Sequence, residues 1–296
     1  MAKTEAHQLY RLADGTLVPG ATSITSLIYD YGKAKGLMGY AYNCGRDHLD
    51  MEAVTKEAQA IGHLVHQLIY DYYKPFMHPE LTFVPTDTSD YSKNQIDAAE
   101  NSYLSFLAWA KRHKVEPVLI EEELKSERYR FGGTLDLLAI IDGRLTLVDF
   151  KSGKDVYLEN WCQLAAYNIL ITENYPEVGP IELFMLVRIG KGEDEDFSEP
   201  WIGPGLKLSL YESIFLHALG IYQDLKEMKG DRRATKKAEK AKAKEIKLAG
   251  KSKGGKRGKR SVDEAGAVGG VDERQGGGDE ARGGEGVPGD SQKVPD

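Results

Sequence analysis

The spacing of apolar residues changes along this chain, from helical periods to strand periods and back. Apolar residues three or four positions apart indicate helices, whereas alternation and short apolar runs between turn residues indicate strands. A Pro19-Gly20 turn precedes a stretch in which Thr22 or Ser23 could cap a short helix. The rest of the pattern predicts helices at 52–73, 92–113, 157–173 and 209–228, and strands at 115–124, 133–141, 144–150 and 181–189.

The order of these elements indicates the fold class. Strands bracketed by helices, with a sheet that is hydrophobic on both faces, are typical of an α/β layered domain. We therefore expect a central β-sheet flanked by helices over residues 1–228, and the sequence shows no internal repeat.

The composition changes after residue 228. Residues 226–260 hold 16 basic and 4 acidic residues, and residues 261–296 hold 3 basic and 9 acidic residues. Aromatic residues stop at Tyr222. Such a segment buries too little apolar surface to offset its ordering entropy. We predict that 229–296 is a mostly disordered, charged and Gly-rich tail, in which only 232–248 has the composition of a helix.

Two interpretations of this tail stay open. It is either a solvated tail or a basic arm that holds nucleic acid through phosphate contacts, with the acidic end competing for the arm. The body is acidic, because residues 1–225 hold 20 Lys and Arg against 33 Asp and Glu. A body of this charge would need a local basic groove, the arm or a partner protein to bind DNA.

The composition also excludes several classes of protein. The only cysteines are Cys44 and Cys162, which argues against a disulfide scaffold, a zinc ribbon or a four-cysteine iron–sulfur cluster. No apolar run approaches the roughly 18 residues that span a membrane, and the N-terminus lacks the pattern of a signal peptide. We expect a soluble, cytoplasmic protein, in the host cytoplasm if a phage encodes it.

A charged cluster is predicted in the most apolar part of the chain. Asp142-Gly143 favours a type I′ hairpin turn between two strands. Counting outward from this turn places Asp136 directly opposite Asp149, with Cβ atoms roughly 4.5–5.5 Å apart. Lys151 follows Asp149 by two residues and therefore points to the same face.

Two buried carboxylates at this distance repel each other, and burial adds the loss of hydration. A hard divalent cation such as Mg²⁺ would relieve the conflict, and Lys151 would then stabilise an attacking water or a phosphate. The alternative is a Lys–Asp ion pair at a strand end with the second aspartate in solvent. Gly132 and Gly133 could bend the strand and could also let a DNA backbone approach closely, and these two roles are compatible.

Three glutamates, Glu121, Glu122 and Glu123, end the strand before the hairpin. Regular alternation of side chains along the strand would place Val118, Ile120, Glu122 and Leu124 on the same face of the sheet. A solvated strand end, with none of the three glutamates in a site, is equally compatible with the sequence.

These motifs, in this order, resemble the PD-(D/E)XK nuclease superfamily and most of all its RecB-like exonuclease branch, which includes phage members and the mitochondrial genome maintenance exonuclease. The resemblance covers about residues 7–190. Its four motifs are Gly62 with His66, Gly133-Thr134-Leu135-Asp136, Asp149-Phe150-Lys151, and Gln163 with Tyr167. The N-terminal motif of the branch, Pro-Ser-Val-Thr, stands here as Thr22-Ser23-Ile24-Thr25, and Leu135 replaces the proline that names the superfamily.

The resemblance implies a restriction-endonuclease-like mixed sheet and a role for each matched residue. His66, Asp136, Asp149 and the Phe150 carbonyl would bind Mg²⁺ or Mn²⁺, and no iron–sulfur cluster is expected. Lys151, and by resemblance Glu121, would assist the reaction. The residues expected to position the site or contact DNA are Gln163, Tyr167, Lys154, Gly133 and Thr134. Spacing alone would make His66 an ordinary histidine at the edge of the core, and Lys154 a solvated lysine.

The function that the resemblance implies is metal-dependent exonucleolytic hydrolysis of DNA. The expected setting is phage or bacterial DNA replication, recombination or repair. The expected partner is a single-strand-binding or recombination protein, and no membrane is involved. Two alternatives stay open. One is a non-catalytic nucleic-acid-binding or assembly module on the same fold, and the other is an endonuclease.

Overall fold

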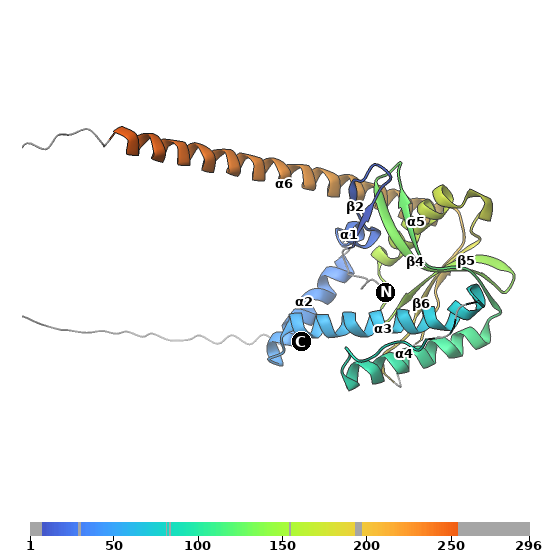
Figure 1. Cartoon of the computed structure of the whole chain (residues 1–296). Coiled ribbons are helices and arrows are strands. Elements are labelled where there is room, and N and C mark those ends of the chain that lie inside the picture. The colour runs from blue at the N-terminus through green and yellow to red at the C-terminus, as the bar shows by residue number, and fades with distance from the viewer. Residues whose placement is uncertain are drawn as a thin grey trace, which may run out of the picture. The chain divides into compact units, whose positions relative to one another are not determined.

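A computed structural model describes residues 8–28, 31–80, 82, 84–153, 155–192 and 197–253. Its elements alternate between helices and strands, as the sequence predicts, and their arrangement is drawn in Figure 1. The strands are β1 (Leu9–Arg11), β2 (Leu17–Pro19), β3 (Val115–Ser126), β4 (Phe131–Ile141), β5 (Arg144–Lys151), β6 (Leu183–Arg188) and β7 (Trp201–Ile202). The helices are α1 (Ala21–Thr25), α2 (Tyr31–Arg46), α3 (Met51–Met77), α4 (Lys93–Arg112), α5 (Leu158–Asn174), η1 (Pro176–Val178) and α6 (Leu206–Lys253).

The central sheet is mixed. Its strand order is β3-β4-β5-β6-β7, in which only the β5–β6 pair is parallel. Helix α5 connects β5 to β6, as a parallel pair requires. This arrangement confirms the predicted α/β fold with a mixed sheet between helices.

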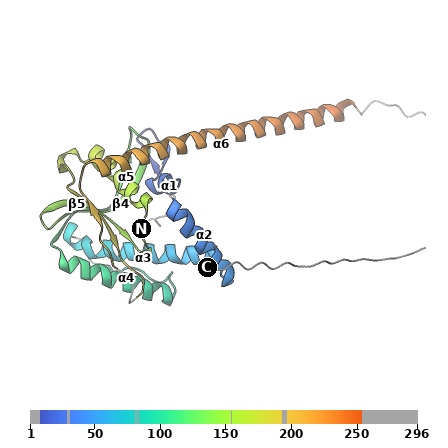
Figure 2. The same cartoon turned by 180° about the vertical axis from the view of Figure 1, so that it is seen from behind.

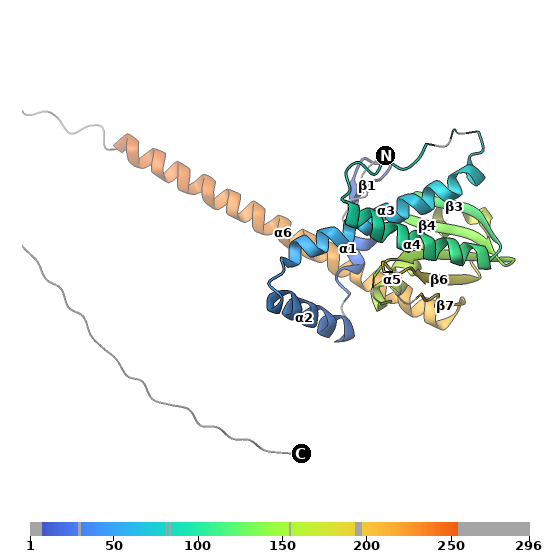
Figure 3. The ribbon, with the colours of Figure 1, turned by 90° about the horizontal axis from the view of Figure 1, so that it is seen from below.

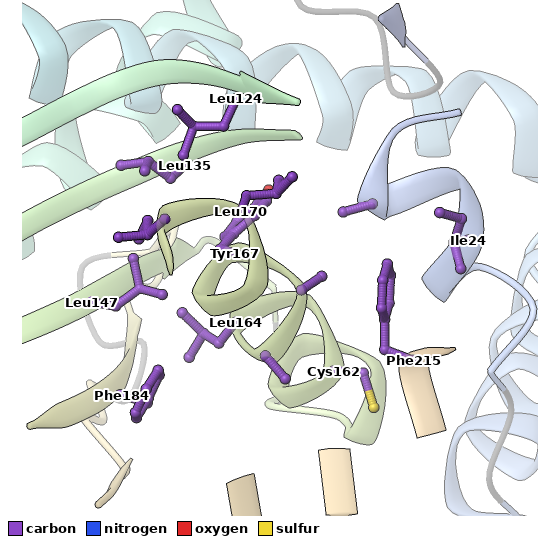
Figure 4. Close-up of a cluster of buried hydrophobic side chains, with 14 of the residues drawn as sticks. Ile24, Leu124, Leu135, Leu147, Cys162, Leu164, Tyr167, Leu170, Phe184 and Phe215 are labelled. Atoms are coloured by element: carbon purple, nitrogen blue, oxygen red, sulfur yellow. The ribbon is translucent and has the colours of Figure 1, made fainter. Parts of the chain in front are cut away.

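Helices cover both faces of the sheet. Helices α3 and α4 lie on one face, and α5 with the first part of α6 lies on the other, as the front and back views show. The view from below shows α4 and α3 running across the strands. The α5 face holds the larger cluster of buried apolar residues, drawn in Figure 4, where Leu164 and Leu170 of α5 lie beside Leu135 and Leu147 of the sheet.

A small N-terminal hairpin, β1–β2, packs beside the start of β4. The buried ring of Tyr10 leaves no space for a Cβ at Gly20, where that atom would lie 2.9 Å from it. Gly20 is the N-cap of α1, and its helix has no side-chain cap. The prediction of a Thr22 or Ser23 cap is therefore wrong, because the helix begins earlier, directly after the bridge between Gly20 and Gly132.

The predicted helices and strands are present, with shifted ends. Helix α3 runs four residues further than predicted, through Pro75 to Met77, and its N-cap Asp50 accepts from the amides of Glu52 and Ala53. The largest difference is α6, which was expected to end at about residue 228 and continues to Lys253. The residues after 228 are rich in Ala, Lys and Glu, which favour helix.

The predicted tail is thus helical over the part that the structure describes, 229–253, and residues 254–296 lie outside the described residues. Contacts divide the chain between Lys236 and Lys237, inside α6. A domain boundary at residue 228 stays a prediction. Among the described residues, no helix is both long enough and apolar enough to cross a membrane.

Candidate active site

Three carboxylates lie in a row across β3, β4 and β5. The β4–β5 ladder pairs Ile141 with Arg144 and Leu137 with Val148, which is the predicted register. Asp136 and Asp149 follow next on the two strands. Asp142 and Gly143 both have positive φ, at 50° and 84°, as a type I′ turn requires. The predicted hairpin is confirmed, and it brings both aspartates to one end of the sheet.

The third carboxylate is Glu121. The β3–β4 ladder pairs Ile120 with Leu137 and Glu122 with Leu135, so Glu121 lies beside Asp136. Glu121 has φ of 47°, a left-handed conformation that few non-glycine residues adopt. The backbone is thus distorted at one of the residues that form the row.

This distortion inverts the alternation of side chains between the two faces. On β3, Ile120 packs on the α3–α4 face, but Leu124 packs on the α5 face. On β4, Leu135 packs on the α5 face, but Leu137 packs on the α3–α4 face. Glu121 and Asp136 sit between these pairs. The predicted common face for Val118, Ile120, Glu122 and Leu124 is therefore wrong. The β3–β4 register already shifts between Pro117 and Leu119, and regular alternation does not continue through the left-handed Glu121.

The inversion lets Glu121 and Asp136 both reach His66 on α3. The Nδ1 atom of His66 lies 3.4 Å from Glu121 Oε1 and 3.5 Å from Asp136 Oδ1. One donor atom from each of these residues lies within 4.8 Å of the others, a spacing compatible with one metal ion. Glu122 instead accepts from the hydroxyl of Tyr175, and Glu123 pairs with Lys125. Of the three glutamates, the structure therefore brings Glu121 to the site.

Asp149 and Lys151 form the other half of the site, on the α5 side. Asp149 is fully buried, and its Oδ2 lies 2.6 Å from Lys151 Nζ. Lys151 Nζ also donates to Gln163 Oε1 at 3.2 Å, and Gln163 Nε2 donates to the Tyr167 hydroxyl at 2.7 Å. Gln163 and Tyr167 are four positions apart on α5 and therefore share one face of the helix. This common face lets them continue the chain of contacts that begins with Asp149 and Lys151.

Two of the predicted metal ligands, Asp149 and the Phe150 carbonyl, are not part of the group formed by His66, Glu121 and Asp136. Among the residues that the structure describes, Asp149 Oδ1 has no hydrogen-bond partner, although it is buried. The Phe150 amide donates to Asp136 Oδ2 at 2.7 Å and so fixes that carboxylate. The ligand roles of Asp149 and the Phe150 carbonyl stay predictions.

The charges of the site perturb its pKa values strongly. Burial lowers the pKa of His66, but the carboxylates of Asp136 and Glu121 more than offset it and raise it to about 9. Burial raises the pKa of Asp136, and it raises the pKa of Asp149 to about 6. Burial opposes the charge of Lys151, yet Asp149 and Asp136 raise its pKa overall. Lys151 is therefore an ammonium at neutral pH.

The glycines of the matched motifs are explained by packing. A Cβ at Gly133 would lie 2.7 Å from the ring of Tyr167, and one at Gly132 would lie 2.3 Å from Tyr10. The close approach predicted at this pair is thus made by two tyrosines of the same chain. On α3, a Cβ at Gly62 would lie 3.2 Å from Ser152 Oγ, just after β5, so the helix packs tightly against the chain there.

Thr134 and Lys154 were also predicted to position the site or to contact DNA. The Thr134 hydroxyl is 3.1 Å from the Tyr10 hydroxyl, at the edge of the site. Lys154 lies outside the described residues. Sequence reasoning missed Glu159, one turn before Gln163 on α5, which pairs with Lys33 of α2 and raises the pKa of Lys151. Its place four residues before Gln163 was the pattern that could have identified it.

Comparison with known proteins identifies the fold family. The family model of the PD-(D/E)XK nuclease superfamily matches residues 38–247, which is well over half of the chain. The chain belongs to the PD-(D/E)XK nuclease superfamily. A search of curated proteins found no match. Among solved structures, the crystal structure of SSO0001 matches with 16% identity over 59% of this chain and 88% of that one, at a TM-score of 0.27. The assignment therefore rests on the family match.

Membership in this superfamily implies a nucleic-acid substrate, and its nucleases usually use divalent metal ions. The residues present fit such an ion. Carboxylates and imidazole are suitable ligands for Mg²⁺ or Mn²⁺. The raised pKa of Asp136 shows that burial opposes its negative charge, and Asp149 Oδ1 is a buried acceptor that no described residue satisfies. A bound cation would relieve both.

Proposed function

We propose that this nuclease is a metal-dependent deoxyribonuclease that hydrolyses DNA from an end. The observation that carries the proposal is the joint placement of His66, Glu121 and Asp136 within reach of one ion, next to the Asp149–Lys151 pair. By analogy with the RecB-like branch, we place its role in phage or bacterial DNA replication, recombination or repair. A single-strand-binding or recombination protein is the expected partner.

The ligands would come from three elements. His66 on α3, Glu121 on β3 and Asp136 on β4 would hold Mg²⁺ or Mn²⁺, and Asp149 with the Phe150 carbonyl is predicted to add to them. A cation in this site supplies positive charge that activates a water and stabilises the charge developing on the scissile phosphate. The Phe150 amide keeps the Asp136 carboxylate oriented.

Lys151 acts as a positive hydrogen-bond donor. Its pKa is raised by Asp149 and Asp136 despite burial, so it holds its proton at neutral pH. It can donate to the attacking water or to a phosphate oxygen, which stabilises the charge that grows in the transition state. Asp149 and Gln163 hold the ammonium from two sides, and Tyr167 fixes Gln163 in turn.

The buried cluster favours a catalyst over a non-catalytic binding module on the same fold. A module without catalysis has no need for buried like charges, since replacing such charges by packed apolar residues is often neutral or stabilising. In this chain Asp136, Asp149 and Lys151 are all retained, although burial opposes their charge.

The experiment is a time course on end-labelled linear DNA beside a covalently closed circle of the same sequence. Each substrate is incubated with Mg²⁺, Mn²⁺ or EDTA, with the unaltered chain and with Lys151→Ala. We expect metal-dependent loss of the linear DNA only, abolished by the substitution, and the position of the label gives the polarity. Cutting of the circle would show an endonuclease. Binding without cleavage of either DNA, with every metal, would leave only the binding module.

A further inference from the structure

Helix α6 carries a one-sided row of basic residues in its second half. In the described helix, residues three or four positions apart share a face. Nine basic residues follow this spacing without a break, and we call them the basic stripe: Lys226, Lys229, Arg233, Lys236, Lys237, Lys240, Lys244, Lys247 and Lys251.

The first two residues of the basic stripe continue the helix face that is buried earlier in α6. Leu208, Phe215, Ala218 and Leu219 are buried in the α5-side cluster, and Tyr211 and Tyr222 pack against it. These positions follow the same spacing of three and four, and the next positions in the series are Lys226 and Lys229, both exposed. One helical face therefore changes from apolar to basic where its burial ends.

The acidic residues of this part of α6 lie away from the basic stripe. Glu227, Asp231, Glu239 and Glu245 are never four positions from a member of the stripe, and only Glu239 is three positions from one, Lys236. Lys242, which is not in the stripe, lies three positions from both Glu239 and Glu245. A helix that serves only as a stable spacer would pair its charges, whereas like charges at i,i+4 destabilise it by about 0.2–0.5 kcal/mol per pair.

We propose that the basic stripe is a docking surface for the phosphate backbone of DNA. This inference rests on the proposed function for the choice of DNA as the polyanion. A row of like charges, unfavourable by itself, becomes favourable against a polyanion, where each neutralised phosphate releases counterions. The stripe would also supply the positive surface that the acidic body, with 20 basic and 33 acidic residues over 1–225, lacks in its composition.

The test compares two double variants of the full chain. Lys240→Gln with Lys251→Gln removes two charges from the basic stripe. Lys242→Gln with Lys253→Gln removes two charges from the opposite side, each two positions further along. Net charge, composition and helix propensity are the same in both variants. Binding to a 30-base-pair duplex is measured by fluorescence anisotropy in EDTA over a series of KCl concentrations, and helicity is measured by circular dichroism.

We expect the stripe variant to bind at least about tenfold more weakly near 0.1 M salt. The slope of log K against log salt should fall by about 1.8, which is the value for two phosphate contacts. The opposite-side variant should keep both values. The stripe variant should be no less helical than its control, because it has fewer like-charge pairs. Loss of binding would then not be a loss of the helix.

Equal binding and equal slopes in the two variants would overturn the proposal, and so would a difference that follows helicity. Vesicles containing phosphatidylserine provide a second probe, and a stripe-specific loss on vesicles without one on DNA would assign the surface to a membrane instead. Because binding is measured in EDTA, it does not depend on cleavage. A chain that binds through the stripe but cuts neither linear nor circular DNA would contradict only the proposed activity.

Discussion

The two ends of the β4–β5 hairpin follow different rules. At the turn end, the ladder is regular, the pairing is the one that Asp142-Gly143 predicts, and burial follows alternation. At the other end, alternation inverts on β4 and on the neighbouring β3, Glu121 is left-handed, and charges are buried. The difference teaches that the hairpin is regular where packing alone decides it, and distorted where side chains from two neighbouring strands, β3 and β4, must meet one histidine.

The largest expected effect is a loss of DNA cleavage when an aspartate at the distorted end of the hairpin is changed. Asp136→Asn keeps an oxygen that can accept from the Phe150 amide but removes a charge from the predicted metal site. We expect cleavage to fall at least about a hundredfold, since the site loses charge that acts on the transition state. The melting temperature should stay equal or rise, because a buried charge is removed.

Asp142→Asn is the matched change at the turn end. Asp142 accepts from the Lys114 amide and contacts His113, which lowers the pKa of the carboxyl. Activity should stay within about twofold, and stability should fall by about 0.5–1 kcal/mol, the usual value of one hydrogen bond. If the two variants lost activity equally, the distinction between the two ends would fail.

A second prediction uses one glycine at each end. Gly133→Ala would place a Cβ 2.7 Å from the Tyr167 ring and should destabilise the fold by about 1–3 kcal/mol. Gly143→Ala meets no neighbour but has φ of 84°, and should cost about 1–2 kcal/mol. Asparagine tolerates the left-handed region, so Gly143→Asn should be milder than Gly143→Ala, whereas Gly133→Asn should be worse than Gly133→Ala. Denaturant unfolding of the four variants checks this reversal.

The third prediction concerns pH in the absence of metal. The pKa of His66 in the folded chain, about 9, lies above the ordinary histidine value of 6.5. Its contribution to stability is therefore full below about pH 6.5 and is lost as pH rises toward 9. Asp149, with a pKa raised by burial to about 6, makes the fold less stable as pH rises from 3.8 to 6. Unfolding in EDTA from pH 5 to 9 should show a decline above pH 6.5 that His66→Gln abolishes.

Added metal should reverse the decline of stability above pH 6.5. A ligand imidazole must be neutral, so binding of Mn²⁺ displaces the proton of His66 and its affinity should rise with pH. A metal affinity that does not change between pH 6.5 and 9 would argue against His66 as a ligand.

The smallest expected effect lies on α5. Tyr167→Phe removes the hydroxyl that accepts from Gln163 Nε2 and leaves the ring against Gly133. We expect a stability change of about 1 kcal/mol or less and a decrease of up to about tenfold in kcat, through a less fixed Lys151. A Gln163→Ala variant, which also removes the contact to Lys151, should lose more activity. A greater loss with Tyr167→Phe than with Gln163→Ala would show that the tyrosine does not act only through Gln163.

The hairpin could be predicted from sequence because its turn residues and apolar strands leave only one register. Asp136, Asp149 and Lys151 followed from that register by counting. Glu121 could not be placed, because alternation assumes extended backbone and Glu121 is left-handed. The α6 helix was predicted too short, because its second half has no apolar face and is helical by composition. Glu159 was missed because a lone acidic residue near a helix N-terminus is common without any functional role.

The central claim is that the distorted end of the hairpin gathers Glu121, Asp136 and His66 around one divalent cation. Its most direct test is a calorimetric titration of Mn²⁺ into the unaltered chain, Glu121→Gln and Glu123→Gln. The two variants make the same chemical change two residues apart on β3, and Glu123 pairs with Lys125 instead of the site. We predict that Glu121→Gln weakens Mn²⁺ binding by at least about tenfold, while Glu123→Gln leaves it within about twofold. Equal affinities in the two variants, or a greater loss with Glu123→Gln, would contradict the account.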